Sequence, residues 1–193
     1  RPVYSSGLFV RADSPVRSIG DLRGKRVAFG DVNSTSAFVF PVTMFLDAGI
    51  DPVRDLSAVR MTGTHANSLA ALLNGEVDAA ALSFDSYDKA VRANVPGARD
   101  LRVVARSEAI PYPPLIVNMR LDPALRGRLR DAFENIDRTP GITPEMIRGY
   151  GGARVDGYAG HVAADHFDPA TRKMAQVTPA LKDEMLRKSA DRQ

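Results

Sequence analysis

Cysteine is absent from the 193 residues of this chain. Its absence excludes disulfide bonds and thiolate metal sites, and it leaves no redox clue to the compartment in which the protein works. Long hydrophobic runs are absent too, because the longest apolar stretch, Ala37 to Leu46, is interrupted by Pro41 and Thr43. A membrane-spanning helix needs about 20 consecutive apolar residues, so the sequence predicts none.

The chain also lacks a concentration of charge of one sign. Its 26 Lys and Arg residues are scattered among 23 Asp and Glu residues, which gives a net charge of +3. This balance is weakly favourable for an anionic ligand and unfavourable for nucleic acid, which binds dense basic stripes. Hydrophobic residues make up 44% of the chain and charged residues 25%, as in ordinary globular proteins. A chain of this length can form one domain or two small lobes.

Strand-like and helix-like segments alternate along the first half of the chain. Such alternation specifies an α/β fold in which neighbouring strands run parallel. The predicted strands are 4–11, 25–29, 56–61, 77–82 and 101–105, and the predicted helices are 37–48, 66–74 and 84–93. Pro41 removes a backbone donor inside the first of these helices, so we expect its first turn to be a separate short piece.

The second half of the chain has a weaker pattern. Residues 110–114 are too rich in proline for a helix and predict a stiff connector, after which residues 115–119 read as a further strand. Helices are predicted at 123–136 and 179–188. The strands around Phe9 and Ile116 bracket a compact α/β unit, and this arrangement indicates a hinge between two lobes.

The most informative segment is the loop from Gly30 to Ala37, which joins a predicted strand to a predicted helix. It contains three consecutive hydroxyl side chains, Ser34, Thr35 and Ser36. The first turn of a helix exposes unpaired N–H groups and the positive end of the helix dipole, and hydroxyl groups add donors that can rotate toward an oxyanion. This combination predicts a site for a phosphate-like anion, although Ser34 also fits the simpler role of an N-cap.

Polar residues follow two further predicted strands. Thr64 and His65 come after the strand that ends at Met61, and Ser83 and Asp85 come after the strand that ends at Leu82. Ligands of open α/β sheets lie beyond the carboxyl ends of the strands, so we expect these residues to converge with the hydroxyl loop. His65 is a candidate hydrogen-bond donor to the anion, and Asp85 a candidate acceptor for a ligand amine or P–OH group.

Each of these candidates also has a structural interpretation. His65 fits a capping or surface histidine, and Asp85 fits the N-cap of a helix that starts near Ser86. Tyr4, near the proposed hinge, fits either a side chain that closes over the ligand or a core aromatic. His161 and His166 do not share one helical face and have no cysteine nearby, so we expect no metal site there.

Several motifs are similar to those of the phosphonate/phosphite/phosphate-binding proteins of ABC importers. These are the run from Ser18 to Ser36, followed by Pro41 and Gly49-Ile50-Asp51; then Gly63-Thr64-His65, the segment from Asn74 to Ala80, and the segment from Ser107 to Pro114. The resemblance covers residues 4 to about 135 well and the remainder loosely. It implies the α/β fold of type 2 periplasmic binding proteins, in which two lobes are joined by a hinge of two strands.

The resemblance also implies roles for individual residues. Ser34, Thr35, Ser36 and His65 match positions that hold the ligand oxygens. Asp85 matches an acidic position that binds the amine of aminophosphonates, and Tyr4 matches a tyrosine that bridges the lobes. Pro113 stands where such members can carry a second acid, which favours phosphite, phosphate or a short alkylphosphonate over an aminoalkyl ligand.

Family members begin with a long stretch of lobe 1 that the sequence does not contain, and the chain starts with Arg1 rather than methionine. We therefore expect an N-terminally truncated chain without its signal peptide. The expected divisions are a hinge strand from lobe 1 at residues 1–9, and a complete anion-binding lobe 2 with a mostly parallel sheet at 10–110. Residues 111–193 would form the return hinge and the C-terminal part of an incomplete lobe 1.

The resulting prediction is a solute-binding protein that captures a small phosphorus oxyanion and delivers it to an ABC permease. We expect a periplasmic or membrane-anchored extracytoplasmic protein that is a monomer at full length, needs no cofactor and binds no nucleic acid. A ligand-sensing domain of a regulator with the same fold is the alternative. An enzyme that uses Ser36, His65 and Asp85 as a triad is disfavoured, because no Gly-x-Ser-x-Gly nucleophile elbow is present.

Overall fold

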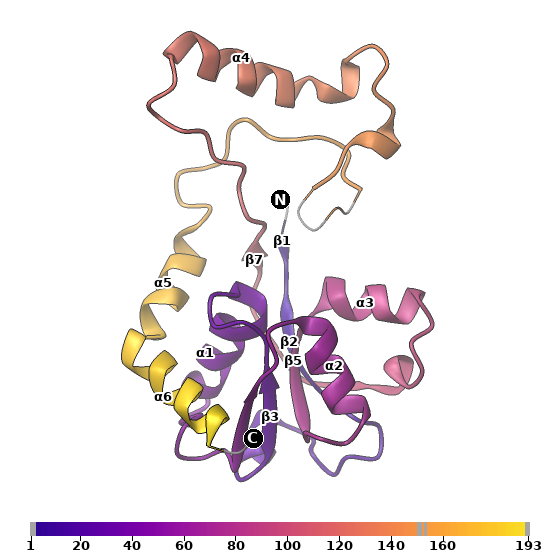
Figure 1. Cartoon of the computed structure of the whole chain (residues 1–193), viewed down its shortest axis with the longest axis vertical. Coiled ribbons are helices and arrows are strands. Elements are labelled where there is room, and N and C mark those ends of the chain that lie inside the picture. Colours follow the sequence, from indigo (N-terminus) through magenta and orange to yellow (C-terminus); the bar gives the residue numbers. More distant parts are fainter. Residues whose placement is uncertain (1–2, 150–151, 153, 192–193) are drawn as a thin grey trace. The chain divides into compact units, whose positions relative to one another are not determined.

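The computed structural model describes residues 3–149, 152 and 154–191. Its internal contacts divide the chain into two units (Figure 1). The first unit combines Arg1–Pro111 with Asp168–Gln193, and the second is Tyr112–Phe167.

The first unit is built on a five-stranded sheet with the strand order β4-β3-β5-β2-β6. Its strands are β2 (Ser6–Val10), β3 (Arg26–Phe29), β4 (Ala58–Met61), β5 (Ala79–Ser83) and β6 (Arg102–Arg106). β3 pairs in parallel with β4 and β5, whereas β2 pairs antiparallel with β5 and β6. The predicted α/β fold is therefore confirmed, and its sheet is mixed: four strands run in one direction and β2 runs against them.

Helices cover both faces of this sheet (Figure 1). The main ones are α1 (Phe40–Asp47), α2 (His65–Leu73) and α3 (Phe84–Arg92). A π-helical turn, η2 (Thr35–Val39), directly precedes α1. The prediction that Pro41 makes the first turn a separate piece is confirmed, since the π turn ends at Val39 and Pro41 lies in the first turn of α1. Two short 3-10 helices, η1 (Ile19–Leu22) and η3 (Ala98–Asp100), complete the connections.

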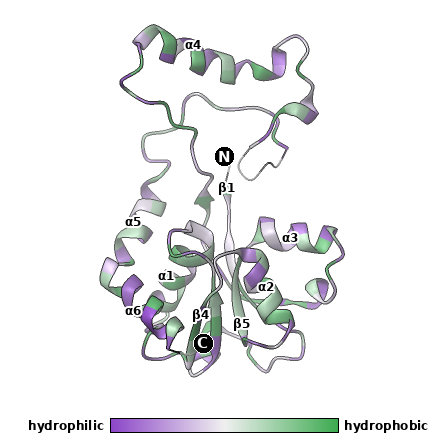
Figure 2. Ribbon diagram, in the orientation of Figure 1, coloured by the Kyte–Doolittle hydropathy of each residue, from purple (hydrophilic) through white to green (hydrophobic). Residues whose placement is uncertain are grey.

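Alternation along the strands creates two hydrophobic cores. Residues that point to one face, such as Leu8, Val27 and Phe29, join a cluster with the aromatic side chains of η2 and α1. Their strand neighbours, such as Phe9 and Ala28, join a second cluster with α2 and α3. All of these strand residues are fully buried. Figure 2 shows the central strand β5 mostly in the hydrophobic colour, as expected for a strand that is buried on both faces.

The C-terminal helices α5 (Asp168–Gln176) and α6 (Pro179–Ala190) belong to the first unit. Met185 on α6 is fully buried in the first cluster. Ser189 Oγ accepts a hydrogen bond from the Met61 backbone N–H at 2.9 Å, at the end of β4. The sequence had placed everything after residue 110 in the other lobe, whereas these contacts attach the last two helices to the α/β sheet.

A second, two-stranded sheet pairs β1 (Val3–Tyr4) with β7 (Ile110–Pro111) in antiparallel register. The segment Arg1–Pro111 of the first unit thus has adjacent, paired strands near its two ends. The strand predicted at 115–119 is wrong, because residues 112–118 have no regular secondary structure. Pro113 and Pro114 provide no backbone donors, and a strand is only stable when a neighbour is available to pair with it.

The second unit contains α4 (Pro123–Glu134) and two 3-10 turns, Ile136–Arg138 and Pro144–Met146. Asp122 caps α4 by accepting hydrogen bonds from two backbone N–H groups of its first turn. None of the residues of α4 is buried. Most of the exposed large hydrophobic side chains of the described residues lie in this unit, namely Leu115, Ile116, Val117, Met119, Leu121, Leu129, Phe133, Met146 and Val162.

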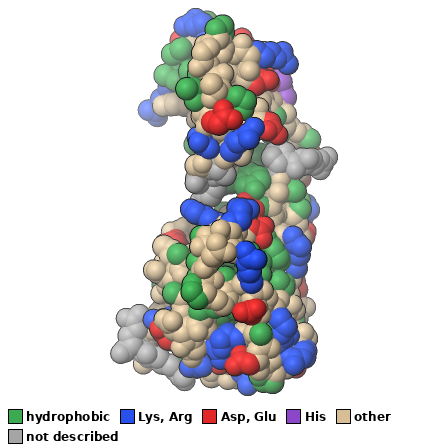
Figure 3. Space-filling view, turned by 90° about the vertical axis from the view of Figure 1, so that its right-hand side faces the viewer, with side chains coloured by type: hydrophobic (Ala, Val, Ile, Leu, Met, Phe, Trp, Pro, Cys, Tyr) green, Lys and Arg blue, Asp and Glu red, His purple; other side chains and the backbone are tan. Residues whose placement is uncertain are grey.

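The surface carries charges of both signs. On the face shown in Figure 3, Lys and Arg side chains are interspersed with Asp and Glu side chains. Across the described parts of the chain, no helix is both long enough and apolar enough to cross a membrane.

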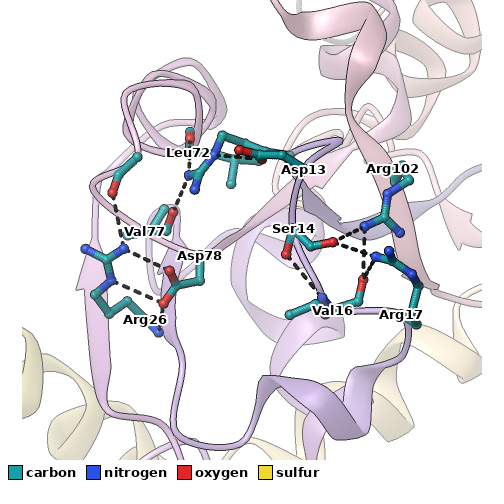
Figure 4. Close-up of polar contacts among 11 residues, drawn as sticks. Asp13, Ser14, Val16, Arg17, Arg26, Leu72, Val77, Asp78 and Arg102 are labelled. Atoms are coloured by element: carbon teal, nitrogen blue, oxygen red, sulfur yellow. Dashed lines mark hydrogen bonds and ion pairs between the residues drawn. The ribbon is translucent and has the colours of Figure 1, made fainter.

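Arg26 and Asp78 join the starts of β3 and β5 (Figure 4). Arg26 Nη2 lies 2.8 Å from Asp78 Oδ1, and the Arg26 backbone N–H donates to Oδ2 at 2.8 Å. The hydrogen bond from the Arg26 side chain lowers the pKa of Asp78, and its partial burial offsets only part of this effect. Asp78 belongs to one of the motifs that carry the family resemblance, and here its role is to hold two strands in register.

We predict that Met185→Ala lowers the free energy of unfolding by about 2–5 kcal/mol, because removal of a fully buried side chain leaves a cavity. The adjacent Leu186 is 41% exposed, so Leu186→Ala should change stability by no more than about 0.5 kcal/mol. Urea unfolding of both variants measures the difference. Equal, small effects would show that α6 does not pack on the sheet.

We predict that Asp78→Asn lowers stability at neutral pH by about 1–3 kcal/mol, the range for a hydrogen bond to a charged group. Because the folded protein lowers the pKa of Asp78 below 3.8, this contribution is complete above that value. It is lost as the pH falls through the pKa of Asp78 in the folded protein. The free energy of unfolding of the variant should therefore fall less steeply at acid pH than that of the wild type. Asp13→Asn is the control. The Asp13 carboxylate is 81% exposed, and its one ion pair among the described residues, with Arg11, is long at 3.5 Å. Identical acid limbs for wild type and Asp78→Asn would contradict the prediction.

Candidate functional site

The candidate site lies where several strands of the first unit end. β3, β4, β5 and β6 all finish at one edge of the sheet, which we call the carboxyl edge. The antiparallel strand β2 starts there, with Ser6 paired to Ser83. The hydroxyl loop, His65 and Ser83 all follow strands that end at this edge.

Ser34 is the N-cap of the π turn. Its Oγ accepts a hydrogen bond from the Ala37 N–H at 3.0 Å, and its carbonyl accepts from Phe38 and Val39 at 3.2 and 3.0 Å. Ser34 is thus an N-cap, because its hydroxyl oxygen accepts this hydrogen bond. The proton of the same hydroxyl can still be donated. The N–H groups of Thr35 and Ser36 have no helical carbonyl before them that could accept a hydrogen bond, as in the first turn of every helix. π turns of this kind are frequent at functional sites.

Gly30 and Pro41 explain why the turn has this shape. Pro41 has no N–H group, so the carbonyl of Ala37 has no α-helical donor. This carbonyl instead accepts a hydrogen bond from the Gly30 N–H at 3.0 Å. The approach is so close that a Cβ atom on Gly30 would lie 2.5 Å from the Ala37 Cβ. A glycine is therefore required at the start of the loop.

Ser36 is almost fully buried, with 5% of its surface exposed. Its carbonyl accepts a hydrogen bond of 2.5 Å from the hydroxyl of Ser6, which is fully buried on β2. The Ser6 backbone in turn exchanges hydrogen bonds with Ser107, just after β6. Ser6 thus connects the hydroxyl loop to the strands that lead to the two-stranded sheet. No sequence motif indicates this role of Ser6, because it depends on the antiparallel pairing of β2.

His65 begins α2, after its N-cap Thr64. Its Nε2 lies 3.3 Å from the Ser36 Oγ, and its Nδ1 accepts a hydrogen bond from the Ser83 N–H at 3.2 Å. The imidazole therefore bridges the π turn and the end of β5. Burial lowers the pKa of His65 below its ordinary value, and the nearby carbonyl of Ala81 offsets part of this shift. The structure thus brings three of the predicted residues, Ser36, His65 and Ser83, into one cluster.

The other predicted residues have different surroundings. Thr35 is partly buried in the first position of the π turn, and Asp85 is exposed in the first turn of α3. The N-cap of α3 is Ser83, so the interpretation of Asp85 as an N-cap is wrong. Tyr4 is partly buried on β1 and packs against the first hydrophobic cluster.

Arg106, at the end of β6, places a positive charge at the carboxyl edge that the sequence analysis missed. Its guanidinium lies 3.9 Å above the centre of the Phe84 ring, and its Nε donates to Ser5 Oγ at 3.0 Å. His161 and His166 belong to the second unit. Within the described residues, no group of three or more His, Cys, Asp or Glu side chains is arranged to hold a metal ion.

The sequence matches the family described as ABC transporter, phosphonate, periplasmic substrate-binding protein, over residues 1–165. The chain belongs to this family. The resemblance inferred from its motifs is thereby confirmed.

Two relatives and one solved structure illustrate the match. The phosphonates-binding periplasmic protein of Escherichia coli is 31% identical over 143 residues, which are 72% of this chain and 42% of that protein. The phosphate-import protein PhnD of Mycolicibacterium smegmatis is also 31% identical over 143 residues, covering 68% of this chain and 44% of that protein. A binding protein component of an ABC phosphonate transporter from Pseudomonas aeruginosa has a TM-score of 0.69 at 21% identity, covering 99% of this chain and 69% of that one. This likeness confirms the predicted fold, and the matched region spans less than half the length of the two curated relatives.

We predict that Gly30→Ala disrupts the candidate site. The added methyl group overlaps the Ala37 Cβ, so the variant should lose about 1–3 kcal/mol of stability through overpacking. Gly20→Ala is the matched control, since its new Cβ would have only an ordinary contact at 3.6 Å with Ser18 Oγ. Urea unfolding compares the two variants, and a Gly30→Ala protein as stable as the control would show that the close approach does not exist.

Proposed function

We propose that the chain is the anion-binding part of a solute-binding protein that captures a small phosphorus oxyanion and delivers it to an ABC permease. The observation that carries this proposal is the cluster of Ser36 and His65, 3.3 Å apart beside the first turn of η2. Hydroxyl and N–H donors gathered at a helix start are suited to a tetrahedral anion. The family and its relatives, whose names include both phosphonate and phosphate, support the same class of ligand.

Individual roles follow from this proposal. Ser34, Thr35 and Ser36 would donate to ligand oxygens through their hydroxyls, together with the N–H groups of the turn. His65 would complete the donor set from α2. Asp85 would meet the substituent on phosphorus, and Tyr4 would contribute where the two lobes meet. Each charge-assisted hydrogen bond contributes about 1.5–3 kcal/mol, so four or five of them reach micromolar affinity after the cost of association.

The second unit would be one part of a lobe that other residues of a longer protein complete. The absence of buried residues in α4 and the exposed side chains of Leu115 and Ile116 support this view, since exposed apolar side chains concentrated in one unit are typical of a surface that another layer covers. The greater length of the curated relatives supports it as well. The paired strands β1 and β7 would act as the hinge, and the complete protein would work as a monomer.

The geometry of His65 supports binding rather than catalysis. A general base that activates Ser36 would need a free lone pair on Nε2. Because Nδ1 accepts a hydrogen bond from the Ser83 N–H, the neutral ring carries its proton on Nε2. The imidazole then has no free lone pair on Nε2 with which to withdraw the Ser36 proton, and its N–H group remains a donor. This arrangement suits a binding protein without a cofactor, located outside the cytoplasm like other members of its family.

We predict that Ser36→Ala and His65→Ala each weaken binding of phosphite or methylphosphonate by roughly tenfold or more, the value of one such hydrogen bond. Calorimetry on a protein that contains both lobes measures the effect. Ser57→Ala is the control, because Ser57 lies just before β4, at the opposite edge of the sheet. If both site variants bind phosphite and methylphosphonate as tightly as this control, the site assignment fails.

A ligand screen identifies the oxyanion. Phosphate, phosphite, methylphosphonate, aminoethylphosphonate and sulfate are compared by thermal shift, and we expect one of the phosphorus oxyanions to give the largest stabilisation. A ligand at one hundred times its dissociation constant adds about 2.7 kcal/mol of stability. A protein stabilised only by sulfate, or by no oxyanion at all, would contradict the proposal.

A further inference from the structure

A group of cations lies at the edge of the sheet opposite the candidate site, which we call the amino edge. β3, β5 and β6 start there, and the antiparallel strand β2 ends there. An open hollow of about 270 Å³ at this edge is lined by Arg11, Asp13, Lys25, Asp78 and the segment 14–16. Figure 4 shows the polar contacts around this hollow.

Two arginines occupy carbonyl groups of the segment 14–16. Arg17 and Arg102 lie side by side, and both donate hydrogen bonds to the carbonyl oxygens of Ser14 and Val16 (Figure 4). A neutral carbonyl orients a guanidinium group but does not cancel its charge. Among the residues that the structure describes, neither arginine forms an ion pair. Both charges therefore add to the positive potential of the amino edge.

Other acceptors beside the hollow are occupied as well. Arg11 Nη1 donates to the carbonyls of Leu72 and Val77 at 3.1 and 3.2 Å. The carboxylate of Asp78 accepts three hydrogen bonds from Arg26, which also balances its charge. The groups around the hollow that could accept a hydrogen bond are thus largely satisfied from within the protein.

Lys25 supplies donors that have no acceptor. Its ammonium group carries three N–H bonds, and in the described part of the chain it makes no hydrogen bond or ion pair, although the residue is half-buried. Its charge is felt in the hollow: the hydrogen bond from Arg26 is the main cause that lowers the pKa of Asp78, and the charge of Lys25 adds to it. A partly buried charge without a partner costs free energy, which an anion in the hollow recovers.

From these satisfied acceptors and free donors, we propose that the hollow is a second oxyanion site, which binds inorganic phosphate or the phosphate group of a monoester. Lys25 and Arg11 donate to the phosphate oxygens, and the charges of Arg17 and Arg102 attract the dianion. The hollow is smaller than the pockets of about 300–1,000 Å³ that enclose drug-sized ligands, which favours a small ion or a single end group. The proposal does not rest on the proposed function, because it concerns the other end of the strands.

The placement of the cations favours phosphate over a carboxylate. They come from three elements, with Arg11 after β2, Lys25 before β3 and Arg102 on β6. A carboxylate presents two oxygens in one plane and is bound best by a single guanidinium fork. A tetrahedral dianion presents oxygens in several directions and carries twice the charge, so it can satisfy cations that approach from different sides.

The first test uses a protein that contains both lobes and carries Ser36→Ala and His65→Ala, so that the carboxyl edge is disabled. Inorganic phosphate and glycerol phosphate are titrated at low salt, and amide NMR shifts locate the bound anion. We expect saturable shifts at residues 11–17 and 25 with both anions, which weaken as sodium chloride is added because the cations are partly exposed. Shifts confined to residues 34–36 and 65, no saturable shift at all, or acetate binding as tightly as phosphate would overturn the proposal.

The second test uses single charge changes in the same protein. Lys25→Gln should weaken phosphate binding by about tenfold or more, the value of one hydrogen bond to a charged group. Asp13→Asn should strengthen binding, because it removes a competing carboxylate that lies 3.5 Å from Arg11. Lys89→Gln is the matched control: it removes the same net charge, but Lys89 is exposed on α3 and does not line the hollow. Equal affinities of Lys25→Gln and Lys89→Gln, or weaker binding by Asp13→Asn, would overturn the proposal.

Discussion

The hydrogen bond from the Gly30 amide to the Ala37 carbonyl holds the candidate site together. Pro41 frees that carbonyl from the helix, and the missing side chain of Gly30 allows the two backbones to meet. The bond folds the loop back onto the helix start and widens its first turn into η2. As a result, Ser36 is buried with its hydroxyl toward His65 rather than exposed on the surface.

Local patterns were sufficient to predict most elements of the α/β unit and the loop at its centre. Short, mostly apolar runs identified the strands β3, β4, β5 and β6, and the proline at position 41 correctly indicated a break before α1. The convergence of Ser36, His65 and Ser83 followed from a general property of parallel strands, which end at a common edge. These features depend on residues that are close in sequence or on one topological rule.

The features that the sequence did not reveal depend on contacts between distant segments. The antiparallel direction of β2 brings Ser6 beneath the hydroxyl loop, and no periodicity in residues 6–10 indicates its direction. The segment 115–119 has the composition of a strand but no regular structure, because composition does not supply a pairing partner. Likewise, the burial of Met185 depends on the packing of α6 against the first hydrophobic cluster, which its own sequence surroundings do not indicate.

At the proposed site on the carboxyl edge, anion attraction would come from oriented donors more than from a basic surface. The dipoles at the starts of η2 and α2 act only within about one turn, so the proposed ligand would have to come close to Ser36 and lose water there. Charges scattered over the surface, as in Figure 3, add little beyond a screening length of about 8–10 Å. Donors of this kind recognise oxygens and are indifferent to the remaining substituent on phosphorus. In the proposed site, selection among oxyanions would therefore come from groups outside the cluster, and Asp85 is the candidate among the described residues.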